Sequence, residues 1–382
     1  MSMGELEARR ILLDRVASMR DTLAAQWMAE EVAATLSATS VAALEDAGIF
    51  AMKLPAALGG HEADPVTQLL VLEALAEVNP SASWCAMVGA SGSGLPAAFM
   101  KDDAVAQMYG GPRLPRAAIV LAPMGKVVPD DGGFRLTGRW PFVSGVRHAQ
   151  WITAGAMAVL TPESKPVHAM LCFPASSATI HDNWQVAGLK GTGSCDISVD
   201  DLLVPASFVW DAFHGEPLRG GAIYRIRHPG FVVNEHAGFA LGVARRALNA
   251  FAERAVNRSR GPSGSLAGRA VVQHMLGEAE TRLAAAKALA ITLNERAYAM
   301  AMAGTMLPDR LQAELRAASL HCTDVAVDVI TRSFRFAGGG AVYEGNILQE
   351  CLRDINVAAQ HVIVSDVAYE TMGRLALGLP EA

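Results

Sequence analysis

The sequence has few aromatic residues and no excess of positive charge. Phe, Trp and Tyr together make up 6% of the 382 residues, and 38 acidic side chains outnumber 32 basic ones, which gives a net charge of −6. A chain without a basic surplus cannot neutralise a phosphate backbone, so we do not expect nucleic acid as a partner. The hydrophobic content of 51% is largely Ala, Leu and Val. This composition favours a protein of packed helices.

Paired cysteines and an apolar leader are also missing. The five cysteines are scattered singly without a CxxC pair, which is typical of reduced, buried thiols in a cytoplasmic protein. The first 15 residues, MSMGELEARRILLDR, are charged throughout and do not resemble a secretory signal. The longest uncharged stretch, Val78–Met100, is long enough to span a bilayer, but its Asn, Pro, Ser and Gly residues favour a buried helix. We therefore expect a cytoplasmic protein without a membrane partner.

The common catalytic signatures are absent as well. GxxxxGK[ST], HExxH and GxSxG do not occur, and the ten histidines are dispersed. The nearest candidate for a GxGxxG motif, GASGSG at Gly89–Gly94, lies in a helical pattern and does not follow a strand. These absences argue against a P-loop, a metal site, a nucleophile elbow and a Rossmann dinucleotide site.

The periodicity of the apolar residues divides the chain into three parts. Residues 1–115 have helical spacing, residues 116–221 contain short β-prone runs separated by polar turns, and residues 222–382 return to helical spacing. We predict a mostly α protein with a small central β-domain, either a sandwich or a barrel, and a C-terminal four-helix bundle. The four long helices are expected at His236–Ala255, Ala270–Ala303, Arg310–Phe336 and Ile347–Leu377.

Three segments carry a resemblance to a known family. They are GGFRLTGRWPFVSGVRHAQWI (Gly132–Ile152), NWQVAGLKGTGSCDISVDDLLVP (Asn183–Pro205) and SFRFAGGGAVYEGNILQECLRDINVAAQH (Ser333–His361). In this order, after an N-terminal helical part, they resemble the acyl-CoA dehydrogenase superfamily. The resemblance implies that family's fold, in which a flavin lies against the β-domain beside the helical bundle.

Smaller motifs resemble one branch of that superfamily, the two-component flavin monooxygenases. These are the W-P-F-x-S-G of Trp140–Gly145, the GTGS of Gly191–Ser194, and the pair Arg353–Asp354 followed by His361. The resemblance implies the oxygenase component, a homotetramer that receives reduced FMN or FAD from a separate flavin reductase. Such an enzyme forms a flavin C4a-hydroperoxide with O2 and oxidises a small aromatic or heterocyclic substrate.

Two alternatives remain open from the sequence. An acyl-CoA dehydrogenase using FAD needs a carboxylate base, which many members carry in a YEG motif about nine residues after the RD pair. Here that place reads QHVIV (Gln360–Val364), and the YEG of Tyr343–Gly345 precedes Arg353, so Glu344 fits that role only if the last loop is placed differently. The second alternative is a non-catalytic flavin-binding protein with the same fold.

The candidate catalytic residues are His361 and Ser144. The pKa of an unperturbed imidazole lies near 6.5, so His361 can donate or accept a proton at neutral pH, although a histidine on an apolar helix is often a core residue. Ser144 precedes a glycine that allows close backbone approach, and it suits a neutral hydrogen-bond donor near flavin N5; the alternative is a residue that closes a turn. Asp354 is expected to pair with a nearby basic residue as a structural link.

The candidate cofactor-binding residues lie in three segments. The GTGS turn offers backbone N–H groups and two hydroxyls for the flavin's pyrimidine edge or a phosphate. The resemblance implies that Arg258 or Arg260 reaches the flavin phosphate of a neighbouring subunit, but no RxxFG accompanies them, so FMN and FAD both remain open. Trp140 is expected either to stack on the flavin ring or to pack the β-domain. The full set is Trp140, Phe142, Ser144, Gly145, Gly191, Thr192, Gly193, Ser194, Arg258 and Arg260.

Overall fold

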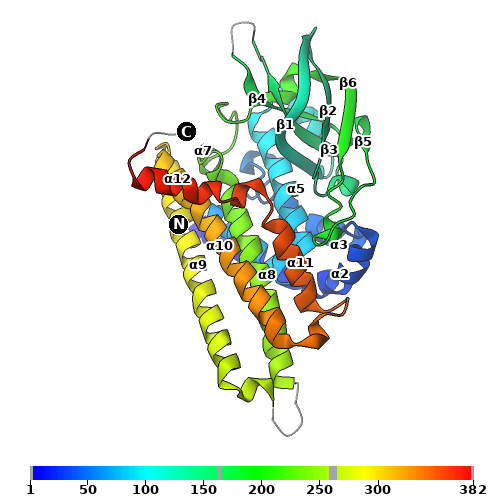
Figure 1. Ribbon diagram of the computed structural model, residues 1–382. Helices are drawn as coiled ribbons and strands as arrows, with labels where there is room; N and C mark the ends of the chain where they lie inside the picture. The colour runs from blue at the N-terminus through cyan, green and yellow to red at the C-terminus, as the bar shows by residue number, and fades with distance from the viewer. Residues whose placement is uncertain (1–2, 162–164, 258–264, 380–382) are drawn as a thin grey trace.

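The computed structural model describes residues 3–161, 165–257 and 265–379. It places a seven-stranded sheet between a helical N-terminal part and a bundle of long C-terminal helices (Figure 1). The fold class predicted from the sequence, mostly α with a central β-domain, is confirmed. The five cysteines are free and buried, as expected.

Six α-helices form the N-terminal part. The starts of the two most buried helices are set by local capping, because Asp64 and Asn79 accept hydrogen bonds from backbone N–H groups of the first turn and a proline follows each of them. The uncharged segment 78–100 forms a buried helix, α5, as predicted. Within the described ranges, no helix is long and apolar enough to cross a membrane. The helices are α1 (Met3–Ser18), α2 (Arg20–Ala33), α3 (Ala38–Asp46), α4 (Pro65–Ala76), α5 (Pro80–Phe99) and α6 (Asp102–Tyr109).

The central strands form one mixed sheet in the order β5-β6-β2-β1-β3-β4-β7. β1 pairs antiparallel with β2 across the turn at 130–133 and parallel with β3. β4 also contacts β6, although three strands separate them in the sheet, so the sheet curls. The strands are β1 (Ala117–Asp130), β2 (Gly133–Trp140), β3 (Trp151–Ala158), β4 (Val167–Pro174), β5 (Thr179–Ile180), β6 (Ile197–Pro205) and β7 (Val209–Asp211).

The C-terminal part contains three long helices as predicted, but the prediction of a fourth is wrong. The segment expected to form one helix, Ile347–Leu377, is two helices separated by residues 359–366. The described helices here are α7 (Ala222–Arg225), α8 (Gly230–Asn257), α9 (Ala270–Met302), α10 (Asp309–Ala337), α11 (Ile347–Ala358) and α12 (Val367–Ala376).

The break between α11 and α12 has a local cause. His361 leaves the helical conformation with ψ 133°, and its ring accepts the N–H of Ile363 at the start of a short 3-10 turn, η10 (Val362–Val364). Arg316 of α10 donates to the carbonyls of Val362 and Ile363, which have lost their helical partners. The β-branched run of this turn also disfavours continued helix. The break therefore aims His361 at the centre of the molecule.

Helix α5 connects the sheet with the bundle. It packs against β1 on one side and α8 on the other (Figure 1). The approach to β1 is close at Gly92, where an added Cβ would lie 3.1 Å from the carbonyl oxygen of Ala117. The small residues that made this stretch an unlikely membrane span therefore allow α5 to sit between two layers.

Candidate active site

The turn that follows β2 is strained and carries Ser144. Phe142 has φ 62°, a left-handed conformation that costs a non-glycine residue roughly 1–2 kcal/mol, and Gly145 has φ 72°. Two backbone hydrogen bonds hold this turn against the GTGS loop: the Val143 N–H donates to the Cys195 carbonyl at 3.2 Å, and the Gly145 N–H donates to the Thr192 carbonyl at 2.9 Å. Such strain persists where the surroundings enforce it, which is common at functional sites.

The GTGS loop is shaped by its own left-handed residues. A 3-10 turn, η5 (Lys190–Thr192), lies between Leu189 with φ 51° and Gly193 with φ 54°. Gly191 packs so closely that an added Cβ would lie 2.9 Å from Ser81 of α5. Gly191 thus lets the loop fold tightly onto α5, and Gly193 lies against the carbonyl of Ala34 at the end of α2. The hydroxyls of Thr192 and Ser194 face the Ser144 turn.

Four side chains of these segments form one hydrogen-bonded chain. The Trp84 indole N–H on α5 donates to Ser144 Oγ at 3.0 Å, Ser144 Oγ lies 2.8 Å from Ser194 Oγ, and Ser194 Oγ lies 2.6 Å from Thr192 Oγ1. The Thr192 hydroxyl donates to the Leu189 carbonyl at 2.7 Å. Ser144, Thr192 and Ser194 are all buried. The structure therefore brings together three of the predicted residues, with Ser144 lying 48 and 50 positions before Thr192 and Ser194 in the sequence.

The Trp84 ring also contacts two histidines. Its ring stands edge-on to those of His236 on α8 and His361, with centroids 5.4 Å and 5.9 Å away, and the two imidazoles are 4.4 Å apart. Sequence reasoning missed both Trp84 and His236. One signal was available for the latter, because Asn234, Glu235 and His236 are three consecutive polar residues inside an apolar helical pattern.

Both imidazoles are neutral at pH 7. Burial lowers the pKa of His361 to about 4, and burial, followed by the charge of a protonated His361 and of Lys53, lowers the pKa of His236 well below its ordinary value. Because the Ile363 N–H donates to His361 Nδ1 at 3.3 Å, the proton of the neutral His361 ring resides on Nε2. The ring packs against Trp84 and His236, while the residue as a whole remains exposed in the single chain.

A buried ion pair lies directly behind His236. Lys53 Nζ donates to Glu235 Oε2 at 2.7 Å, to the Phe231 carbonyl at 2.8 Å and to Ser91 Oγ at 3.1 Å, and neither charged side chain is more than 1% exposed. Glu235 Oε1 has no hydrogen-bond partner within the described residues. The pair ties the loop before α4 to α8 at the back of the site.

Two of the predicted aromatic residues behave differently from each other. Trp140 is completely buried in the core of the sheet, and its indole N–H donates to the Gly155 carbonyl at 2.8 Å. No face of Trp140 is open to a flavin, so the packing alternative replaces the expectation that it stacks on the ring. Phe142 is 70% exposed, with its ring edge-on to Trp184 at 6.3 Å. Of the two, Phe142 can contact a ligand.

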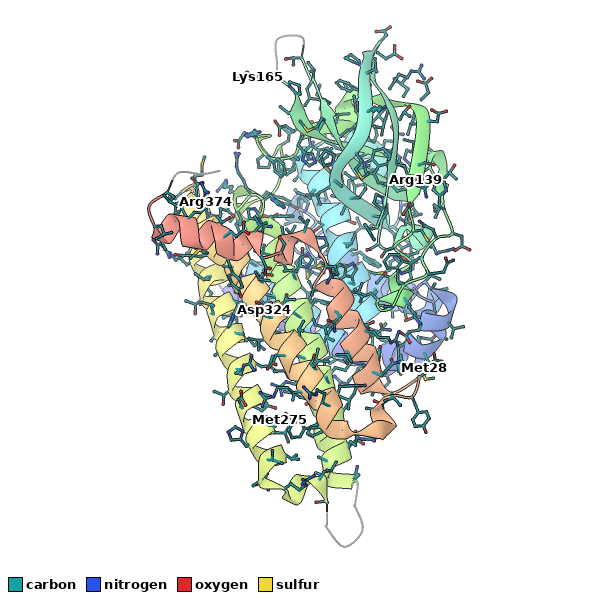
Figure 2. All side chains as sticks on the ribbon, in the orientation of Figure 1. Met28, Arg139, Lys165, Met275, Asp324 and Arg374 are labelled. Atoms are coloured by element: carbon teal, nitrogen blue, oxygen red, sulfur yellow. The ribbon has the colours of Figure 1, made fainter. Side chains whose placement is uncertain are left out.

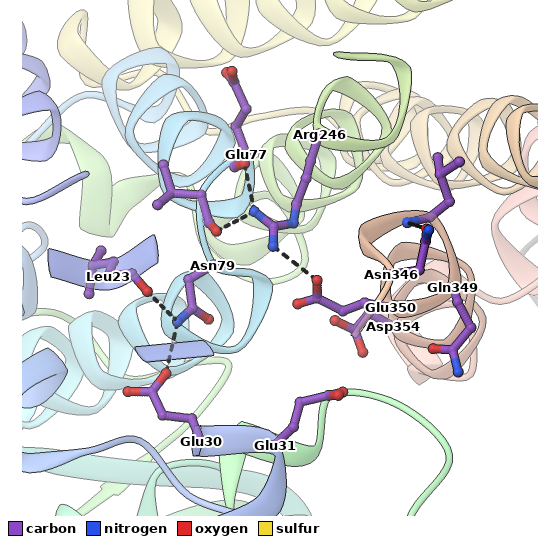
Figure 3. Close-up of polar contacts among 12 residues, drawn as sticks. Leu23, Glu30, Glu31, Glu77, Asn79, Arg246, Asn346, Gln349, Glu350 and Asp354 are labelled. Atoms are coloured by element: carbon purple, nitrogen blue, oxygen red, sulfur yellow. Dashed lines mark hydrogen bonds and ion pairs between the residues drawn. The ribbon is translucent and has the colours of Figure 1, made fainter. Parts of the chain in front are cut away.

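Behind the GTGS loop lies a buried network of charged groups (Figure 3). Arg246 donates to Glu350 at 2.9 Å, Asn79 donates to Glu30 at 2.8 Å, and Arg353 pairs with Glu31 at 2.9 Å. The expectation that Asp354 pairs with a basic residue is wrong, because its Oδ1 accepts the backbone N–H of Leu189 at 2.6 Å. Burial, and then repulsion from Glu350, raise the pKa of Asp354 well above its ordinary value. Asp354 thus holds the start of the GTGS loop.

The remaining predicted residues lie away from this group. Arg258 and Arg260 are outside the described residues. Glu344 is exposed in the turn before α11, whereas His361 follows the other end of that helix. Gly345 in the same turn lies beside Met28 of α2, which is labelled in Figure 2. No group of three or more His, Cys, Asp or Glu side chains in the described part of the chain is placed to hold a metal ion.

Comparison with known proteins identifies the family. The N-terminal domain model of acyl-CoA dehydrogenases matches residues 7–101, and the C-terminal domain model matches residues 235–366. The pigment production hydroxylase of a Rhodococcus species is 30% identical, with 97% of each chain covered. The chain belongs to the flavin-dependent monooxygenases of the acyl-CoA dehydrogenase superfamily.

Two further relatives of this flavin-dependent monooxygenase define the branch. The oxygenase component of an FADH2-dependent resorcinol hydroxylase from a Rhizobium species is 29% identical, covering 96% of this chain and 94% of the relative. The crystal structure of the HsaA monooxygenase from Mycobacterium tuberculosis superposes with a TM-score of 0.90 at 25% identity, covering 98% and 99% of the two chains. The monooxygenase prediction is confirmed, and the acyl-CoA dehydrogenase alternative is not supported.

The residues at the end of β2 fit a flavin. The strained turn after β2 exposes the Phe142 ring, and two residues later it carries the buried hydroxyl of Ser144, which accepts from Trp84. An exposed aromatic ring and a hydroxyl on one short turn suit a flat ring system with polar edges. This flavin-dependent monooxygenase works with reduced flavin, and its oxygenase-component relatives imply a separate reductase and a small-molecule substrate.

Proposed function

We propose that this chain binds reduced flavin with the N5 edge at Ser144 and oxidises a small aromatic substrate held beside His236 and His361. The observation that carries the proposal is the position of Trp84, whose indole N–H donates to Ser144 while its ring contacts both imidazoles. One side chain thus borders the flavin-side hydroxyls and the proton-exchanging groups. Reduced flavin, when bound, supplies the two electrons that activate O2.

Each residue has a separate task in this proposal. Phe142 packs on the ring, and Ser144 contacts N5, while Thr192 and Ser194 hold Ser144 in place. His361 donates its Nε2–H to an oxygen atom in the site. His236, which is buried and neutral, accepts a hydrogen bond from a substrate hydroxyl or N–H. Ser144, Thr192, Ser194 and His236 are buried, which limits the access of bulk water to this part of the site.

A phenol is the substrate class that suits this pair of neutral imidazoles. A hydrogen bond from the phenolic hydroxyl to His236 increases the electron density of the aromatic ring and orients it for attack by an electrophilic oxygen. The apolar surroundings of Trp84 and Phe239, whose rings are 5.1 Å apart, suit the body of such a ring. Resorcinol, the substrate in the name of one relative, has this chemistry.

We further propose a homotetramer in the cytoplasm, with a flavin reductase as a transient partner. The C-terminal segment supports the tetramer, because it exposes the apolar side chains of Val362, Val367, Tyr369 and Leu377 by 40% or more. The five unpaired buried thiols support a reducing compartment. From the sequence, Arg258 and Arg260 remain candidates for the flavin phosphate of a neighbouring subunit.

The proposed cofactor state can be tested by titration under nitrogen with FMN and FAD in both redox states. A reductase delivers reduced flavin by diffusion, so we expect the reduced form of one flavin to bind more tightly than its oxidised form. Flavin fluorescence and equilibrium ultrafiltration measure both affinities. Equal affinity for the two redox states, or a permanently bound FAD after purification, contradicts the proposal.

A further inference from the structure

The hydroxyl chain between Trp84 and Leu189 has only one arrangement of protons. Each hydroxyl has a single hydrogen to donate, an indole N–H can only donate, and a carbonyl oxygen can only accept. The chain has an indole at one end and the Leu189 carbonyl at the other. Its two ends therefore fix the direction of every hydrogen bond between them.

The assignment starts from the carbonyl. The Thr192 hydroxyl donates its only hydrogen to the Leu189 carbonyl, so Thr192 Oγ1 must accept a hydrogen bond from Ser194. Ser194 Oγ must then accept from Ser144. The hydrogen of Ser144 is thereby used within the protein, and the Trp84 indole takes one of the Ser144 lone pairs. Ser144 can therefore offer a ligand one lone pair and no hydrogen, so an acceptor replaces the donor that the sequence led us to expect at this position.

We propose that this fixed polarity makes the site selective for the redox state of flavin. The inference rests on the proposed function, because it takes Ser144 as the contact of flavin N5. Reduced flavin carries a hydrogen on N5 and can donate it to the free lone pair of Ser144. Oxidised flavin has only a lone pair on N5, so two acceptors would face each other. Thr192 and Ser194 act as positioning residues that set this preference through Ser144.

The expected preference for reduced over oxidised flavin follows from the free energy of one hydrogen bond. A hydrogen bond gained by the reduced form contributes roughly 2- to 10-fold in affinity, and an unpaired buried acceptor costs the oxidised form roughly 5- to 100-fold. Because the flavin couple transfers two electrons, each 10-fold preference for the reduced form raises the midpoint potential of the bound flavin by about 30 mV. The preference is therefore measurable both as affinities and as a potential.

Two kinds of variant separate the contribution of each hydroxyl. In Ser194→Ala and Thr192→Val, the hydrogen of Ser144 becomes free to turn toward N5, so oxidised flavin should bind about 5- to 10-fold more tightly while reduced flavin binds as before. In Ser144→Ala the acceptor itself is removed, so reduced flavin should bind about 5- to 10-fold more weakly. Thr192→Ser keeps the hydroxyl and is the matched control, expected to behave as the unaltered protein.

The experiment measures affinities for oxidised and reduced FMN and FAD under nitrogen, and the midpoint potential of the bound flavin, for all five proteins. The inference predicts that Ser194→Ala and Thr192→Val lower the potential by about 20–30 mV through tighter oxidised binding. Unchanged ratios, or an equal weakening of both redox states, would overturn it and leave the hydroxyls with a purely structural role. If the unaltered protein shows no preference for reduced flavin, the proposed function fails instead. A thermal melt of each variant identifies any loss of folding. If either Thr192→Val or Ser194→Ala fails to fold, the other still tests the inference.

Discussion

At the scale of single residues, the position of His361 decides what its imidazole can do. It lies outside a helix, its Nδ1 accepts the backbone N–H of Ile363, and its ring packs against Trp84 and His236. The residue type and number were predictable from the motif that ends in His361. Its tautomer was not, because the helix break that supplies the Ile363 N–H was missed.

We predict that His361→Ala uncouples the enzyme. Substrate oxidation should fall about 10²- to 10⁴-fold, the usual contribution of a positioned proton-transfer group. Oxidation of reduced flavin by O2 should continue, and its electrons should appear as hydrogen peroxide. The measurement is the ratio of oxidised product to hydrogen peroxide for each flavin consumed.

Two controls accompany this variant. His274 on α9 is a histidine with an exposed side chain far along the chain from the site, and His274→Ala should leave the ratio unchanged. Glu344→Gln should also have little effect, since Glu344 is exposed at the opposite end of α11. A loss below about 10-fold in His361→Ala would instead assign His361 to packing.

The other residues show where sequence patterns carry information and where they do not. Ser144, Thr192 and Ser194 were predictable because short motifs contain them. Trp84 and His236 were missed because their meeting depends on how α5 crosses α8, which no spacing within either helix encodes. For Trp140 the sequence allowed either stacking on the flavin or packing in the sheet. Which one occurs depends on the curl of the sheet, because the curl decides whether a side chain at the end of a strand points into the core or toward a ligand.

At the scale of elements, the Lys53–Glu235 pair fastens the loop before α4 to α8. Removing one partner leaves the other as an uncompensated buried charge, which typically costs 3–5 kcal/mol, whereas replacing both by apolar residues is often neutral. We predict that Lys53→Met lowers the free energy of unfolding by about 3–5 kcal/mol. The double variant with Glu235→Leu should recover most of this loss.

Urea unfolding of the two single variants and the double variant measures this coupling. The double variant should lose much less free energy of unfolding than the sum of the two single losses, and it should be more stable than Lys53→Met alone. If the losses simply add, the pair makes no net electrostatic link between these elements, and the account of this contact is wrong.

The element boundaries were predictable where side chains act locally. Apolar spacing and caps such as Asp64 and Asn79 mark helices within their own sequence. The break after α11 depends instead on Arg316 of α10 reaching across to Val362 and Ile363. A contact from a distant segment ends this helix, and periodicity alone therefore predicted one helix in place of two.

At the scale of the whole molecule, stability should depend on pH through buried histidines. Burial, and then the positive charge of Arg116, lower the pKa of His148 to about 4, and its Nδ1 is buried without a partner among the described residues. The unfolded chain binds this proton near pH 6.5 and the folded chain only near pH 4. His148 therefore has no effect on stability above pH 6.5 and destabilises the fold as the pH falls from 6.5 to 4.

We predict that His148→Gln removes this part of the pH dependence. Between pH 7 and pH 5 the unaltered protein should lose about 2 kcal/mol more of its free energy of unfolding than the variant does. Urea unfolding of both proteins at the two pH values gives this difference. The same loss in both proteins would show that His148 is protonated in the folded state at pH 5.

The order of the three parts of the molecule followed from the sequence alone, because helical and strand periodicities change sharply along it. The active site did not, since it is assembled from the end of β2, the loop before β6, α5, α8 and the break after α11. Five segments meet there, and the motifs that carry the family resemblance indicated three of them in advance, whereas α5 and α8 were missed.

The central claim is that this assembly transfers one atom of O2 to an aromatic substrate at the expense of reduced flavin. The direct measurement is a single turnover in which the protein, with reduced FMN or FAD, is mixed with ¹⁸O2 and resorcinol, phenol or indole, and products are analysed by mass spectrometry. The account predicts a hydroxylated product that carries one ¹⁸O atom, with no more than one such product formed per flavin oxidised. Hydrogen peroxide as the sole product with all three aromatic compounds, together with bleaching of a bound FAD by an acyl-CoA under nitrogen, would contradict it.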